Sequence, residues 1–135
     1  MKIIVGQGSC GLAAGAGKVY DAIAALNPKA ALGITGCIGM CYLEPIVDLY
    51  DGDKLVKRLV QVSETDAEAI VKAADNGDLD AVAHIAISSD DESFLSQQTR
   101  IALRNCGVID PTSIDAYIQS GGYEALKKEI GRAHV

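Results

Sequence analysis

The cysteines are the residues of this chain best suited to chemistry, and they are unevenly distributed along it. Cys10, Cys37 and Cys41 fall in glycine-containing segments, whereas the fourth cysteine, Cys106, stands far along the chain. Thiolates are ligands of zinc sites and iron–sulfur clusters, and they also form redox-active disulfides. We therefore treat Cys10, Cys37 and Cys41 as candidate metal ligands.

The predicted secondary structure brings these three cysteines to one edge of a sheet. Residues 2–5 and 30–35 are short apolar strands, and the apolar face of residues 14–26 predicts the helix that connects them. Such a crossover makes the two strands parallel. Cys10 and Cys37 each follow one of these strands, in loops that meet at the same sheet edge, so we expect the thiols to converge. The glycines allow backbone N–H groups to approach sulfur, which tunes iron–sulfur clusters.

Other chemistry stays open for these segments. Cys37 and Cys41 could form a redox pair, although C-x-x-C is the usual spacing, and a zinc site could add His84. Three half-buried thiols without a metal are a further alternative. Residues 6–11 match the dinucleotide pattern G-x-G-x-x-G, but the second strand ends Ile34-Thr35-Gly36, without the acidic residue that holds a ribose.

The order of the elements predicts an α/β (α+β) domain with a small mixed sheet. Residues 46–50 and 54–60 read as two further strands joined by the hairpin turn 51–53. A helix follows from Ser63, with an apolar stripe over 67–74. The resulting order, β-α-β-β-β-α, resembles a thioredoxin-like fold with helices flanking the sheet.

The remainder of the chain has a different composition. Residues 85–93 are polar and acidic and are predicted to be an extended linker. Helix signals follow at 110–112 and over 123–130. We therefore expect a domain at 1–84, a linker at 85–93 and a C-terminal helical extension at 94–135.

The charge and composition exclude several classes of function. The net charge is −6 and the pI is near 4.7, with five Tyr, one Phe and no Trp. Nucleic acids and anionic membranes need clustered Lys and Arg, so neither is expected as a partner. Apolar runs are short, which argues against membrane insertion and a signal peptide, and a cytoplasmic location is expected.

Three segments together resemble a known family. The stretches IIVGQGSCGLAAGAGK (3–18) and ITGCIGMCYLEPIVDLY (34–50) are similar to the thioredoxin-like [2Fe-2S] ferredoxin domain that opens the NADH-binding flavoprotein subunits of complex I-like enzymes and electron-bifurcating hydrogenases. Residues 94–130 are similar to the segment that leads from this domain into the flavin domain. The resemblance implies a [2Fe-2S] cluster, with Cys10, Cys37 and Cys41 as its second, third and fourth ligands.

The sequence departs from the family's ligand pattern at one position. The family has C-x4-C followed by C-x3-C, and its first ligand aligns with Val5, which cannot bind iron. A substitute ligand could be the Ser9 hydroxyl, a solvent oxygen, or Cys106 if its segment folds back. We otherwise expect Cys106 to be a packed thiol and Glu44 to be a surface charge.

The resemblance also implies a place in a larger assembly. The flavin domain and the NADH site of such subunits do not occur in this sequence. We therefore expect an electron-transfer module, part of or partner to an NAD(P)H-linked hydrogenase or dehydrogenase and not catalytically complete alone. Its partners would be other subunits of that complex, and a homo-oligomer is compatible with the sequence. The alternative is a cluster-free docking domain, which the absence of a ligand at Val5 keeps open.

Overall fold

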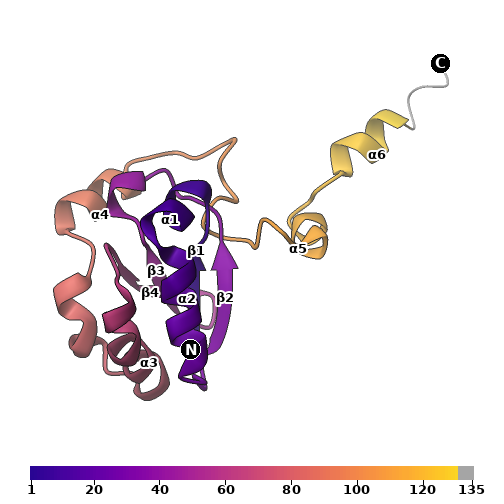
Figure 1. Ribbon diagram of the computed structural model, residues 1–135. Helices are drawn as coiled ribbons and strands as arrows, with labels where there is room; N and C mark the ends of the chain where they lie inside the picture. The colour runs from indigo at the N-terminus through magenta and orange to yellow at the C-terminus, as the bar shows by residue number, and fades with distance from the viewer. Residues whose placement is uncertain (131–135) are drawn as a thin grey trace.

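A four-stranded mixed sheet forms the centre of the computed structural model, which describes residues 1–130 (Figure 1). The strand order is β2-β1-β3-β4, with β1 parallel to β2 and antiparallel to β3. The strands are β1 (Lys2–Gly6), β2 (Ala31–Thr35), β3 (Val47–Asp51) and β4 (Lys54–Leu59). The predicted parallel pair and the hairpin between the last two strands are confirmed. This is the thioredoxin-like mixed sheet expected from the sequence.

Side chains alternate between the two faces along each strand, and those on the face that carries the helices are apolar. Val5 pairs with Val47, which in turn pairs with Leu59, and all three side chains are fully buried. The next position, Asp48, points to the other face, where Arg58 binds its carboxylate through two hydrogen bonds of 2.7 and 2.6 Å. The sheet therefore has one apolar face and one that includes a buried ion pair.

Two helices cover the apolar face. Helix α2 (Ala16–Ala25) and helix α3 (Ala67–Asn76) pack their apolar residues into the same core cluster as β1, β3 and β4. A 3-10 turn (Glu64–Asp66) precedes α3 and carries the capping box predicted at Ser63. A second 3-10 segment (Leu79–Ile85) follows α3 and packs against it. Asp75 joins α3 to the start of β2 by accepting the backbone N–H groups of Lys29 and Ala30.

The segment predicted to be an extended linker, 85–93, is in fact packed and partly helical. Ile87 donates its N–H to the carbonyl of Arg58 at the end of the sheet. Helix α4 (Ser89–Ser96) follows, with Ser88 accepting the N–H of Asp91 as its cap. The acidic residues that suggested a linker fill the first turn of this helix, where the helix dipole favours negative charge. The division into domains at 1–84 and 94–135 stays a prediction.

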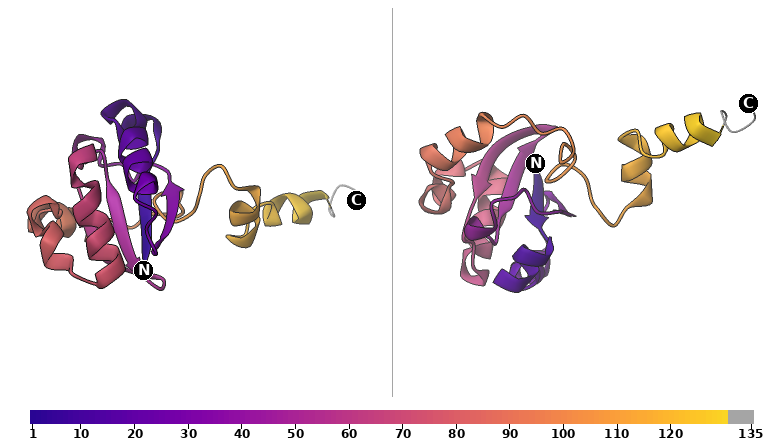
Figure 2. Two further views of the ribbon diagram at one scale, coloured as in Figure 1. Left: turned by 60° about the horizontal axis from the view of Figure 1, so that its bottom comes forward. Right: turned by 90° about the horizontal axis from the view of Figure 1, so that it is seen from above.

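The end of the described chain forms an arm that leaves the body (Figures 1 and 2). Helices α5 (Ile114–Gln119) and α6 (Glu124–Ile130) match the predicted helices, and Tyr117 and Tyr123 form an edge-to-face pair between them. The arm exposes large apolar side chains at Ile114, Tyr117, Ile118, Tyr123, Leu126 and Ile130. The last part of the predicted extension, 131–135, lies outside the described residues.

Candidate metal centre

Cys10 lies in the first turn of a short helix, not in the loop predicted from the glycines. Helix α1 (Ser9–Ala14) begins directly after Gly8, and Gly15, at φ 104°, separates it from α2. Only glycine adopts this left-handed conformation at little cost. The chain therefore changes direction at Gly15, where α1 ends and α2 begins. The predicted helix at 14–26 is therefore preceded by a separate turn of helix that carries Cys10.

The second loop of the site leaves β2 and passes directly over the first. Gly36 to Met40 form this loop, and Cys41 opens a 3-10 turn (Cys41–Leu43). A Cβ atom on Gly8 would lie 2.7 Å from the Cβ of Cys37 and 2.8 Å from its backbone nitrogen. Glycine is therefore required at position 8 because the two loops touch there.

The three thiols converge, as the topology predicts. The Sγ atoms of Cys10, Cys37 and Cys41 all lie within 4.8 Å of one another. The Sγ atoms of Cys37 and Cys41 are 3.7 Å apart, and Gly39 donates its backbone N–H to Cys37 Sγ at 3.3 Å. Cys10 and Cys37 are half-buried, whereas Cys41 is exposed. That these residues bind a metal stays a prediction.

The two neighbouring thiols change the acidity of Cys41. Hydrogen bonds to the thiols of Cys10 and Cys37, with repulsion from their thiolates, raise the pKa of Cys41 to about 12. The Cys41 thiol is therefore a weaker acid than an isolated cysteine. A bound metal inverts this balance because it deprotonates coordinating thiols outright.

The donor set fits an iron–sulfur group. In tetrahedral sites with metal–sulfur bonds of about 2.3 Å, two ligand sulfurs lie roughly 3.8 Å apart. The 3.7 Å separation of Cys37 and Cys41 therefore suits two ligands of one metal ion. Sulfur ligands with a backbone N–H donor are also the environment in which [2Fe-2S] clusters are held.

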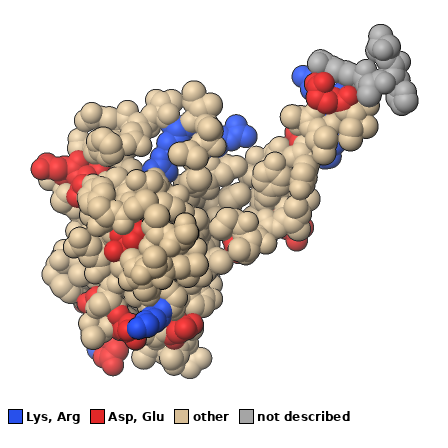
Figure 3. All heavy atoms as spheres, turned by 45° about the horizontal axis from the view of Figure 1, so that its top comes forward, with Lys and Arg blue, Asp and Glu red and all other residues tan. Residues whose placement is uncertain are grey.

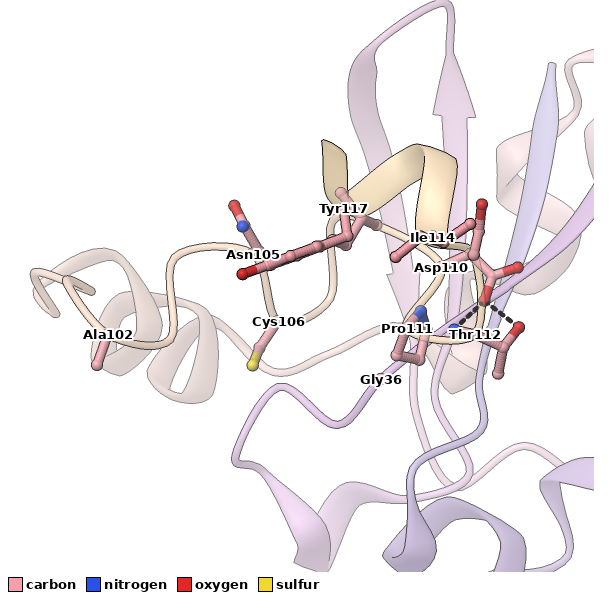
Figure 4. Close-up of a pocket in the computed structure, with 11 residues that line it drawn as sticks. Gly36, Ala102, Asn105, Cys106, Asp110, Pro111, Thr112, Ile114 and Tyr117 are labelled. Atoms are coloured by element: carbon pink, nitrogen blue, oxygen red, sulfur yellow. Dashed lines mark hydrogen bonds between the residues drawn. The ribbon is translucent and has the colours of Figure 1, made fainter. Parts of the chain in front are cut away.

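Two of the residues considered as ligands, His84 and Cys106, lie outside the thiol group. His84 faces Asp66 at 3.9 Å and does not belong to the thiol group. Val5 is fully buried in the core. Cys106 is a half-buried thiol outside the thiol group, and it lines a cavity of about 510 Å³ with Gly36 (Figure 4). Ser9 is exposed and directly precedes Cys10. Of the two side chains suggested as a substitute for the first ligand, Ser9 and Cys106, it is the one closer in sequence to the cysteines of the thiol group.

Glu44 is buried and not the surface charge that was expected. Only 8% of the residue is exposed, and its carboxylate accepts the N–H of Ile46 at 2.9 Å. Burial raises the pKa of Glu44. A Cβ atom on Gly11 would lie 3.0 Å from its Oε2 atom, so Glu44 fills the space between the two cysteine loops. The glycines that leave this space are visible in the sequence, but their distance from Glu44 along the chain hides the contact.

Comparison with solved structures finds proteins of the same fold. No protein-family model matches the chain. A thioredoxin-like [2Fe-2S] ferredoxin from Aquifex aeolicus aligns with a TM-score of 0.52 and 20% identity, covering 64% of this chain and 89% of the ferredoxin. A wild-type ferredoxin structure of the same description aligns with a TM-score of 0.48 and 20% identity, covering 65% and 96%.

A curated protein is similar over a short stretch. The NADP-reducing hydrogenase subunit HndC of Solidesulfovibrio fructosivorans is 66% identical over 34 residues, which are 25% of this chain. The match spans only 7% of the length of that relative. The structural likeness concerns the fold alone, and it is the one predicted from the sequence: the chain has the fold of the thioredoxin-like [2Fe-2S] ferredoxins.

Proposed function

We propose that this chain is an electron-transfer module that carries a [2Fe-2S] cluster on Cys10, Cys37 and Cys41. The observation that carries the proposal is the convergence of three thiols from two loops of a thioredoxin-like fold. Such a cluster supplies a one-electron redox couple. The pair Cys37 and Cys41 would hold one iron, and Cys10 with a further ligand would hold the other.

The surroundings of the thiols suit electron transfer. Ile38 and Met40 of the loop form a small apolar cluster with Leu43 and Ile46, which lowers the local dielectric around the site. Cys41 is exposed, so one edge of the site faces the surface. A redox partner that docks there would come close to the cluster without any movement of the loop.

We further propose that the module works within an NAD(P)H-linked hydrogenase or dehydrogenase, in contact with other subunits or domains. The similarity of one stretch to a subunit of an NADP-reducing hydrogenase supports this. The apolar side chains exposed on α5 and α6 supply surface that a partner could cover. On the face shown in Figure 3, few charges lie where the arm leaves the body, and Lys and Arg do not gather into a patch that would bind nucleic acid. No helix among residues 1–130 is long and apolar enough to cross a membrane.

Metal analysis tests the proposal. Protein purified or reconstituted without oxygen is expected to be red-brown, with visible absorption and with iron and inorganic sulfide in equal amounts. Cys37→Ser is expected to abolish this, whereas Cys106→Ser, a matched change outside the thiol group, is expected to retain it. Loss of the cluster in both variants would contradict the assignment of Cys106 as a packed thiol.

A cluster-free docking domain is the second candidate. The observation that favours it is the burial of Val5, which leaves the first ligand position of the family filled by a core side chain. Wild-type protein without iron after reconstitution, with an unchanged fold and a bound partner subunit, would support this candidate over the first.

A further inference from the structure

Residues 100–109, here called the strap, lie over the loop that carries Cys37. Thr35 donates its hydroxyl to the carbonyl of Ile109 at 2.9 Å. A Cβ atom on Gly107 would lie 2.3 Å from Cγ2 of Ile38, so the strap backbone rests on that side chain. Asn105 and Cys106 of the strap line the same cavity as Gly36, which follows β2 (Figure 4). The strap therefore contacts residues on both sides of Cys37.

Arg100 fixes the strap to this loop. Its guanidinium donates one hydrogen bond to the carbonyl of Ile38 at 2.5 Å and another to the carbonyl of Cys106 at 3.3 Å. The carbonyl of Ile38 belongs to the three-residue spacer between the two cysteines of the C-x3-C motif. One side chain thus links Cys106 of the strap to the spacer of the C-x3-C motif.

The charge of Arg100 is not neutralised by a contact ion pair. No carboxylate among residues 1–130 lies within 4.0 Å of its guanidinium nitrogens, in contrast to Arg58, which binds Asp48. Glu92 lines the same groove along β4 as Arg100 but does not pair with it. Arg100 as a whole is half-buried, so the field of its charge is screened less than that of a fully exposed side chain.

We propose that Arg100 is a positioning residue that holds the Cys37–Cys41 loop and raises the reduction potential of the group bound there. The proposal rests on the proposed function. A [2Fe-2S] cluster gains one negative charge on reduction, and a fixed positive charge nearby favours that state. The two hydrogen bonds of the guanidinium also keep the loop in the conformation that brings Cys37 and Cys41 together.

Two measurements test the proposal on the full chain. The first is the midpoint potential of the reconstituted protein, and the second is the rate at which iodoacetamide alkylates Cys37 in the metal-free protein. The variants are Arg100→Gln, which removes the charge, and Arg100→Lys, which keeps the charge but not the planar fork. The matched control is Arg104→Gln, an exposed arginine of the same strap, which removes the same charge without a carbonyl contact.

The expected result is a downward shift of the potential in Arg100→Gln, a smaller shift in Arg100→Lys, and little change in Arg104→Gln. Alkylation of Cys37 is expected to be faster in both Arg100 variants. A potential in Arg100→Gln equal to that of Arg104→Gln would overturn the proposal, because a merely structural residue would also speed alkylation. If wild-type protein takes up no iron, the proposed function fails, and unchanged alkylation rates would then overturn the positioning role as well. Should Arg100→Gln fail to fold, Arg100→Lys decides by the same two measurements.

Discussion

Replacing Gly8 with alanine is expected to push the two cysteine loops apart. The backbone at Gly8, with φ −63° and ψ 168°, is extended and suits any residue, so the effect comes from the side chain alone. The new methyl carbon would lie 2.7 Å from the Cβ of Cys37, whereas ordinary contacts begin near 3.4 Å. Cys37 must therefore move by about 0.7 Å, or α1 must move with Cys10.

The loss of unfolding free energy can be estimated from the size of this clash. Overpacking of a tight contact costs about 1–3 kcal/mol of unfolding free energy. Alanine is also a poorer N-cap than glycine, which acts in the same direction. The matched control is Gly17→Ala in α2, where the new carbon would meet only Leu12 at 3.8 Å. This control is expected to stabilise the protein by about 0.5–1 kcal/mol because alanine favours helix.

Urea unfolding of the metal-free protein measures the stability of both variants. Iron analysis after reconstitution measures how much metal each variant retains. We expect Gly8→Ala to be less stable than wild type and to retain less iron, and Gly17→Ala to be more stable and to retain as much. A Gly8→Ala variant as stable as Gly17→Ala, with wild-type iron content, would refute the close packing of the two loops.

Four further predictions address the rest of the molecule. Val5→Cys restores the family's C-x4-C spacing, and we expect more iron per chain and slower loss in air; equal loss in both proteins would show that position 5 does not reach the site. Backbone N–H groups hold the pKa of Asp75 below its ordinary value, so the ionised carboxylate stabilises the fold above about pH 4 and does so less as pH falls through the lowered pKa. Asp75→Ala should therefore lose more stability at pH 7 than at pH 2, and an equal loss at both would contradict the linkage. Asp48→Ala leaves the guanidinium of Arg58 buried without a partner and should lower the free energy of urea unfolding by about 3–5 kcal/mol. The double variant Asp48→Leu/Arg58→Met removes both charges and should lower it less. A double variant no more stable than Asp48→Ala would contradict the burial of this ion pair. Limited proteolysis is expected to cut first outside 1–84, and early cuts inside that range would contradict the proposed domain.

The sheet and its cysteine edge could be predicted because local patterns determine them. The apolar strands, the crossover helix and the hairpin turn at Gly52 are each encoded within a few neighbouring residues. Parallel pairing of β1 and β2 then brings Cys10 and Cys37 to one edge whatever the details of the loops. The convergence of the thiols follows from topology more than from any contact between side chains.

The features that sequence reasoning missed depend on contacts between distant residues. Gly8 indicated a loop, yet its role is to let α1 begin against Cys37. Glu44 is buried because the glycines of the first loop leave room for its carboxylate. The polar run after Ser88 forms a helix because its cap and acidic first turn favour one, and Leu95 packs against the apolar cluster that includes part of the cysteine loop. Arg100 gave no signal at all, since its partners are backbone carbonyls.

Electron paramagnetic resonance of the reconstituted protein, before and after reduction, shows directly whether the three thiols hold a [2Fe-2S] cluster. We expect no signal from the oxidised protein and a spin-one-half signal after reduction, as a single [2Fe-2S] cluster gives. The signal should be absent from Cys37→Ser and present in Cys106→Ser. A high-spin ferric signal from the oxidised protein, or zinc bound in place of iron with no signal in either state, would show that the three thiols hold a single metal ion and not a [2Fe-2S] cluster.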